Sequence, residues 1–143
     1  MIKINPYLAF NGEAEEAFNF YKSVFGGEFS SFQKFKDVPE ADRKKGGIKD
    51  SESEKIINVG LPIGNEVLMA SDSPESMGKP KIGGFSISVE TDSKEEAEKI
   101  YKGLSTGGKI TMPLGDTFWG AYYGMLTDKF GVHWMVSYTY PKK

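Results

Sequence analysis

The sequence of 143 residues contains no cysteine and a single histidine, His133. The absence of cysteine excludes disulfides, thiolate nucleophiles and cysteine-based zinc sites. The single histidine excludes a metal site with two imidazole ligands from one chain. Any metal ion would need carboxylates, one imidazole at most, or ligands from a second chain.

Long apolar runs and basic clusters are also missing. No run approaches the roughly 18 residues of a membrane span, and the first ten residues lack the apolar region and cleavage site of a signal peptide. Lys and Arg number 18 against 20 Asp and Glu, for a net charge of −2. We therefore expect a cytoplasmic protein with neither a nucleic-acid nor a membrane partner. The length suits a single domain, residues 1–143.

Two segments of the chain repeat each other. Residues 15–27 read EEAFNFYKSVFGG and residues 95–108 read EEAEKIYKGLSTGG, at an offset of 80. Both predict amphipathic helices with acidic first turns and glycine at the end. Asp92 or Ser93 is the expected N-cap of the second helix. The expected buried stripes are Ala17, Phe20, Tyr21 and Val24 in the first helix and Ala97, Ile100, Tyr101 and Leu104 in the second.

A second repeat indicates an insertion in the first half. VLMAS (67–71) matches HWMVS (133–137) at an offset of 66, so the first half holds extra residues. We place them in 34–55, a highly charged segment that we interpret as a solvated loop, either a plain insertion or a lid. Alternating patterns predict strands at 4–10, 28–35, 55–63 and 64–72, and at 84–90, 109–114, 120–128 and 131–140. The chain thus has α+β class, with tandem βαβββ modules at 1–75 and 82–143.

The alternation within strand 84–90 predicts where a ligand site lies. Phe85, Ile87 and Val89 alternate with Ser86, Ser88 and Glu90. The apolar side should receive the helix, leaving the polar side toward water or a cavity. Two such modules with their helices outside would form a cup-shaped mixed sheet around a cleft. The segment 117–137, which holds both tryptophans and the histidine, would contribute alternately to the core and the pocket wall.

A duplicated βαβββ module with these motifs resembles the vicinal oxygen chelate superfamily (glyoxalase, bleomycin-resistance proteins and dioxygenases), and most closely its PhnB-like branch. The motifs are PYLAFNGEAEEAFNFYKSVFGG, LMASDS and GGKITMPLGDTFWGAYYGMLTDKFGVHWMV. The resemblance implies a homodimer and, in the family's enzymes, a divalent metal held inside the cup by His and Glu or Gln. Here the matching positions are Pro6 or Tyr7, Phe85 or Ser86, and Met135. Because a divalent cation prefers anionic oxygen or imidazole ligands, we expect no metal and no cofactor.

Several residues are candidates for binding a small-molecule ligand, and each has an ordinary structural alternative. His133 is a general base or a hydrogen-bonded strand residue; Trp119 lines a ligand site, a dimer contact or the core; Trp134 belongs to the core. Met69 and Met135 suit an adaptable pocket or a core equally. Glu90 and Asp116 could bind a cationic group or lie at a solvated edge. The expected ligand-binding residues are Tyr7, Asn58, Met69, Ser86, Ser88, Glu90, Trp119, Tyr123, Met125, His133 and Met135; catalytic residues are not assigned.

Three functions remain open at this point. The first is a metal-free protein that binds or sequesters a small amphipathic molecule. The second is a lyase, isomerase or transferase of the same superfamily that acts on a small metabolite or antibiotic. The third is a dimeric interaction module whose cup is filled by its own side chains. Whether the two modules pair within one chain or across a dimer, and which strand faces line the cup, also stays open.

Overall fold

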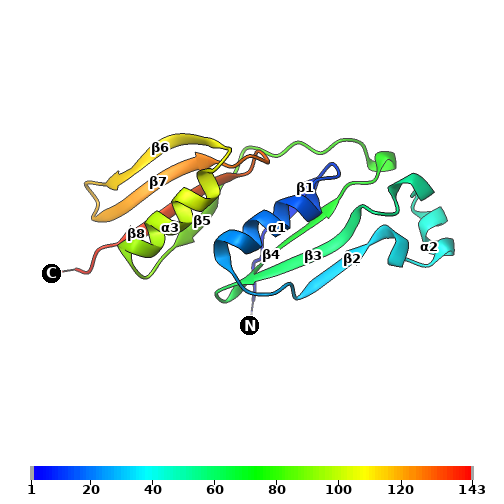
Figure 1. Ribbon diagram of the computed structural model, residues 1–143, viewed down its shortest axis with the longest axis horizontal. Helices are drawn as coiled ribbons and strands as arrows, with labels where there is room; N and C mark the ends of the chain where they lie inside the picture. The colour runs from blue at the N-terminus through cyan, green and yellow to red at the C-terminus, as the bar shows by residue number, and fades with distance from the viewer. Residues whose placement is uncertain (1, 143) are drawn as a thin grey trace. The chain divides into compact units, whose positions relative to one another are not determined.

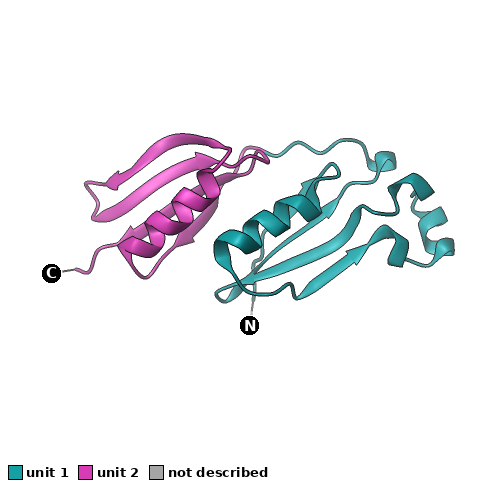
Figure 2. Ribbon diagram, viewed as in Figure 1, with its two compact units in different colours: residues 1–82 teal, residues 83–143 magenta. Residues whose placement is uncertain are grey.

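The computed structural model describes residues 2–142 and divides the chain into two compact units, residues 1–82 and 83–143 (Figure 2). Each unit contains one module of the predicted repeat. The first unit has β1 (Tyr7–Phe10), α1 (Ala14–Phe25), β2 (Ser31–Lys34), β3 (Ile56–Ile63) and β4 (Glu66–Asp72). The second has β5 (Ile87–Glu90), α3 (Lys94–Ser105), β6 (Lys109–Asp116), β7 (Ala121–Thr127) and β8 (His133–Thr139) (Figure 1).

The two modules share one topology. The strand orders are β1-β4-β3-β2 and β5-β8-β7-β6. In each sheet the first strand pairs in parallel with the last, and the other pairs are antiparallel. The predicted α+β class and the tandem βαβββ arrangement are therefore confirmed. None of the helices within residues 2–142 is long and apolar enough to cross a membrane.

The helix of the second module packs as predicted. Ala97, Ile100, Tyr101 and Leu104 are all buried, and α3 contacts β6, β7 and β8. Ser93 is the N-cap, since its hydroxyl accepts a hydrogen bond from the amide of Glu96 at 3.1 Å. This confirms one of the two expected caps.

The buried stripe of α1 differs from the prediction. Ala14, Ala17, Phe18 and Tyr21 are buried, whereas Phe20 and Val24 are only half-buried. The buried set has the same i, i+3, i+4, i+7 spacing, but it begins three residues earlier. The ring of Phe18 packs edge-on against Phe10 of β1 and against Tyr21. The strand beneath the helix, rather than the helix sequence, thus selects which of the two phenylalanines, Phe18 or Phe20, is buried.

The insertion lies between β2 and β3, where it was predicted, but it is not a structureless loop. It contains a 3₁₀ turn at Phe35–Asp37, the short helix α2 (Glu40–Lys45) and a second 3₁₀ turn at Asp50–Glu52. Its charged residues lie mostly at the surface, yet Phe35 and Glu52 are each only 2% exposed. Those two side chains anchor the segment to the module, which a reading of charge alone could not reveal.

The carboxylate of Glu52 makes the stability of this insertion depend on pH. It accepts hydrogen bonds from the amides of Lys49 and Glu75 and from the ammonium of Lys55. Burial by itself raises the pKa of Glu52, but these hydrogen bonds outweigh it and hold the pKa below its usual value of 4.5. A carboxyl with a lowered folded-state pKa stabilises the fold above its unfolded pKa, and that stability is lost as the pH falls through the folded pKa.

We therefore expect Glu52→Gln to make the free energy of unfolding less dependent on pH in the acid range. The free energy of unfolding of the wild type should fall as the pH drops below about 4.5, and that of the variant should fall less. Urea denaturation at a series of pH values measures both. Glu54→Gln is the control: hydrogen bonds from Lys34 and Lys36 also lower the pKa of Glu54, but its carboxylate is exposed and screened by solvent, so its removal should change the slope less than that of Glu52. Identical slopes for wild type and Glu52→Gln would contradict the prediction.

Candidate functional site

The strand register of the second module brings most of the predicted ligand-binding residues onto one face of its sheet. Ser88 lies opposite Met135, Met135 opposite Met125, and Met125 opposite Met112. These four residues form one row across β5, β8, β7 and β6, because residues paired across strands point to the same side. We call this side the methionine face; it comprises Ser88, Glu90, Met112, Tyr123, Met125, Thr127, His133, Met135 and Ser137.

The opposite side of the same sheet is the core. Trp134 and Val136 of β8 and Leu126 of β7 are buried, on the side that carries α3. Trp134 also donates from its indole Nε1 to the buried carboxylate of Asp128 at 2.8 Å. The predicted core role of Trp134 is confirmed. Alternate residues of β8 thus serve the core and the methionine face.

Aromatic and sulfur groups contact one another at one end of the methionine face. The Tyr123 hydroxyl lies 3.1 Å from the sulfur of Met135. Trp119, in the turn between β6 and β7, packs edge-on against Tyr123 with ring centroids 5.7 Å apart, and it remains 56% exposed. A partly exposed tryptophan beside a tyrosine and flexible methionines offers an adaptable apolar surface.

The hydrogen-bond partner of the His133 ring is a hydroxyl group, whereas a general base of the triad type is oriented by a carboxylate. The Nδ1 of His133 lies 2.7 Å from the hydroxyl of Thr127, its partner across β7 and β8. A hydroxyl partner fixes the orientation of the ring through a single hydrogen bond. This geometry favours the interpretation of His133 as a hydrogen-bonded strand residue.

The two carboxylates singled out from the sequence lie on different sides of the sheet. Glu90 is exposed on the methionine face, where it accepts a hydrogen bond from Thr139 at 3.0 Å. Asp116 pairs with Tyr122, whose hydroxyl reaches Glu98 of α3. Asp116 therefore lies exposed on the side of the helix, which favours the second of its two alternatives, a solvated edge position. There its carboxylate accepts a hydrogen bond from Tyr140 and raises the pKa of that phenol to about 12.

The first module places Tyr7, Met69 and Asn58 on the side of its sheet opposite α1. Tyr7 pairs with Met69, and Met69 pairs with Gly60, two residues from Asn58. By this register the counterpart of Tyr7 in the second module is Ser88, which pairs with Met135. Phe85 or Ser86 was expected at that place, but both precede β5. The register of a parallel pair depends on tertiary contacts, which the repeat in the sequence does not encode.

A cavity of about 430 Å³ lies in the first module, beside the insertion. It is lined by Gln33, Asp37, Val38, Pro39, Ile57 and Asn58. Of these, only Asn58 was predicted to bind a ligand. The others lie in or beside the charged segment that we interpreted as a loop, and no motif in the sequence marks them.

The positions that correspond to the family's metal ligands do not fit a divalent cation. They carry the phenol of Tyr7, the hydroxyl of Ser88 and the thioether of Met135. All three groups are neutral, and hard divalent cations prefer anionic oxygens. Within residues 2–142, no group of three or more His, Cys, Asp or Glu side chains is arranged to hold a metal ion. No chemical step is therefore assigned to a metal.

Comparisons with known proteins agree with this fold. The family model of the Glyoxalase/Bleomycin resistance protein/Dioxygenase superfamily matches residues 3–136. Protein YjdN of Escherichia coli is 30% identical over 139 residues, which are 94% of this chain and 93% of that protein. The crystal structure of protein PA1353 from Pseudomonas aeruginosa is 42% identical, with 97% and 98% of the two chains covered and a TM-score of 0.87.

A PhnB protein from Bacillus cereus is also similar, with 29% identity, coverage of 96% of this chain and 100% of that one, and a TM-score of 0.75. The resemblance inferred from the sequence motifs is thereby confirmed. The chain belongs to the glyoxalase/bleomycin resistance protein/dioxygenase superfamily, the vicinal oxygen chelate superfamily, and is PhnB-like.

Proposed function

We propose that this protein binds a small amphipathic molecule on the methionine face of its second module, without a metal ion. The observation that carries the proposal is the row of Ser88, Met135, Met125 and Met112. All four side chains are at least partly exposed. Methionines adapt their shape to an apolar ligand, and the neighbouring polar groups of Ser88 and Glu90 would orient it by hydrogen bonds.

Trp119 and Tyr123 supply the aromatic part of this site. Their rings already contact each other, so a flat ligand would extend an existing aromatic cluster. Burial of apolar ligand surface against these rings would supply most of the affinity.

The proposal is tested on protein purified under non-denaturing conditions from its own host. Bound small molecules are extracted and quantified by mass spectrometry. We expect the wild type to carry one compound at nearly one per chain. Met135→Lys should retain at least about tenfold less, because a charged ammonium replaces an apolar contact.

Met77→Lys is the matched control for this experiment. Met77 is 76% exposed in a 3₁₀ turn of the first module, and its replacement should leave the bound amount unchanged. An empty wild type, or equal amounts in the two lysine variants, would overturn the proposal.

The second candidate function is an enzyme of the same superfamily. It is favoured only by the polar groups beside the methionines, His133 and Glu90. We expect titration with Zn²⁺, Ni²⁺ or Mn²⁺, followed by calorimetry, to show no tight stoichiometric uptake. Uptake of one ion per chain that is lost in Glu90→Gln or His133→Ala would favour the enzyme, and a screen against methylglyoxal–thiol adducts and epoxide antibiotics would then identify its reaction.

We also propose that the protein forms a homodimer. Two large apolar side chains outside the proposed ligand site remain exposed on β6 and in the turn after it, Ile110 and Phe118. Phe118 is 97% exposed, which is unusual for phenylalanine in a monomer. Light scattering coupled to size exclusion should give twice the mass of one chain. Phe118→Ser should weaken the dimer, and a monomeric wild type would contradict this proposal.

A further inference from the structure

The cavity of the first module exists because of an irregularity in its sheet. The register between β2 and β3 shifts after Gln33: Gln33 pairs with Asn58, but Lys34 pairs with Ile56. Ile57 is thus an extra residue without a partner in the ladder. Such a bulge redirects side chains that would otherwise alternate between the two faces, and here both Ile57 and Asn58 line the cavity.

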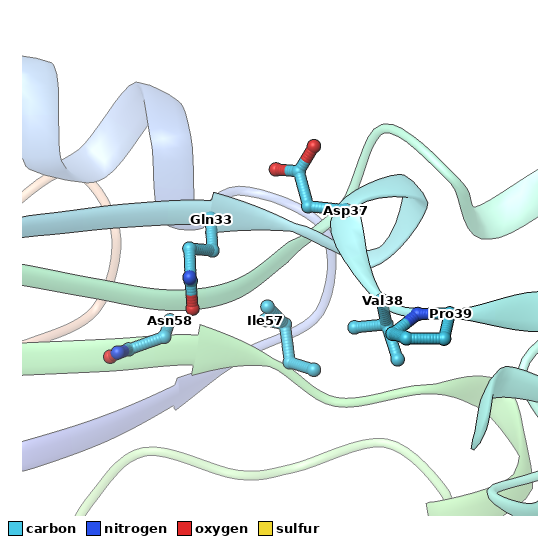
Figure 3. A pocket seen from close by; sticks show the side chains of 6 residues that line it. All are labelled: Gln33, Asp37, Val38, Pro39, Ile57 and Asn58. Atoms are coloured by element: carbon cyan, nitrogen blue, oxygen red, sulfur yellow. The ribbon is translucent and has the colours of Figure 1, made fainter.

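The insertion builds the other wall. Val38 and Pro39 follow directly after its first 3₁₀ turn. Backbone hydrogen bonds tie this turn to the segment before β3, from Phe35 to Lys55 at 2.9 Å and from Lys36 to Ser53 at 3.0 Å. Val38, Pro39 and Ile57 form the apolar part of the lining. Figure 3 shows these three side chains close to one another.

The polar part of the lining consists of two neutral amides. Gln33 reaches from β2 toward Asn58 on the paired strand (Figure 3). The carboxylate of Asp37 points away from the other five side chains, and it accepts a hydrogen bond from the amide of Lys34 at 2.9 Å. The cavity therefore offers hydrogen-bonding groups without presenting a free charge.

One of these amide groups lacks a hydrogen-bond partner. The Oδ1 of Asn58 is buried and accepts no hydrogen bond within residues 2–142. A buried carbonyl oxygen without a donor is unfavourable, and such atoms in folded proteins call for an explanation. The terminal torsion of an asparagine side chain is soft, so rotation of the amide can present this oxygen to the adjacent cavity.

We propose that this cavity binds a small uncharged molecule that combines an apolar body with an N–H or O–H donor, such as a carboxamide or an alcohol. The donor bonds to Oδ1 of Asn58, the Gln33 amide contacts the same polar group, and the apolar body packs on Val38, Pro39 and Ile57. The volume lies in the range of small-molecule sites. This site is built from residues of the first module alone, and its test does not depend on the function proposed for the methionine face.

Benzamide and N,N-dimethylbenzamide are the probes for this proposal. Both have the same ring and carbonyl, but only benzamide carries N–H donors. Each is titrated into the ¹⁵N-labelled full-length protein and followed by ¹H–¹⁵N correlation spectra. We expect benzamide to shift the backbone amides of Gln33, Val38 and Ile57 and the side-chain amide of Asn58 in a saturable manner, and the dimethyl compound to bind about tenfold more weakly.

Two variants test the cavity itself. Asn58→Leu removes the acceptor, and Val38→Phe fills the space without touching the sheet ladder; both should abolish the saturable shifts. Asn19→Leu, on the exposed side of α1, should preserve them. If Asn58→Leu fails to fold, Val38→Phe carries the test alone.

Absence of saturable shifts in the wild type, equal affinity for the two probes, or unchanged binding in Val38→Phe would each overturn the inference. Shifts confined to the second module would do so as well, while leaving the proposal for the methionine face intact.

Discussion

Replacing Gly124 with alanine should lower the free energy of unfolding by about 2–3 kcal/mol. Gly124 lies on the core side of β7, and a β-carbon there would lie 2.8 Å from Cε2 of Tyr101 and 3.0 Å from Cα of Leu114. The Tyr101 ring cannot easily move away. It is 7% exposed, and its hydroxyl donates to the carbonyl of Met112 at 2.9 Å and lies 3.4 Å from that of Met125.

Urea denaturation of the wild type and Gly124→Ala measures this effect. Gly115→Ala is the matched control, because Gly115 lies on the neighbouring strand β6 and a β-carbon there meets nothing within 4 Å. Its stability should stay within about 0.5 kcal/mol of the wild type. Equal stabilities for the two alanine variants would show that the close approach of Tyr101 to Gly124 is not rigid.

Asp72→Ala should lower the free energy of unfolding at least as much as Gly124→Ala does, by about 3 kcal/mol or more. The carboxylate of Asp72 is 2% exposed at the end of β4. One oxygen accepts from the amides of Gly12 and Ala14 at 2.9 and 3.0 Å, and the other accepts from Ile56 at 2.8 Å. Its removal leaves three amide groups without an acceptor and detaches the start of α1 from the sheet.

Asp72→Asn and Asp92→Ala complete this series. The asparagine keeps one acceptor oxygen but turns an N–H group toward backbone donors. The free energy of unfolding of Asp72→Asn should therefore lie between those of the wild type and Asp72→Ala. Asp92 is exposed in the connection between β5 and α3, before the N-cap Ser93, and Asp92→Ala should cost less than about 1 kcal/mol. Thermal or urea unfolding ranks the variants; a loss for Asp72→Ala no larger than that for Asp92→Ala would refute the role of Asp72.

The caps of the two helices show how far the sequence could predict the fold. Ser93 was predictable as a cap because it is adjacent to the helix whose amide it binds. The corresponding position before α1 is Glu13, which makes no side-chain cap. The cap there is Asp72, 58 residues from Ala14 along the chain. No local pattern identifies an acceptor that tertiary folding brings to a helix.

The candidate sites likewise contain residues that a local pattern predicts and residues that only tertiary folding brings together. Alternation was sufficient to group residues within one strand, Ser88 with Glu90 and His133 with Met135, since the period of a strand is short and regular. The strand pairing then brought these groups onto one side of the sheet. The side on which Asp116 lies could not be predicted, because two register shifts precede it in the pairing of β6 with β7. The cavity beside Asn58 escaped prediction because it depends on a bulge at Ile57.

The sequence by itself determined the repeated module, its secondary structure elements, the position of the insertion and the neutral residues at the places of the family's metal ligands. These properties follow from periodicity, residue chemistry and motif, all of which are local. The tertiary structure alone decided which face of α1 is buried, which residue of β5 corresponds to Tyr7, and how the insertion and the bulge together line a cavity. These features depend on strand register and on packing between distant residues, where a shift of one position reverses the direction of every side chain.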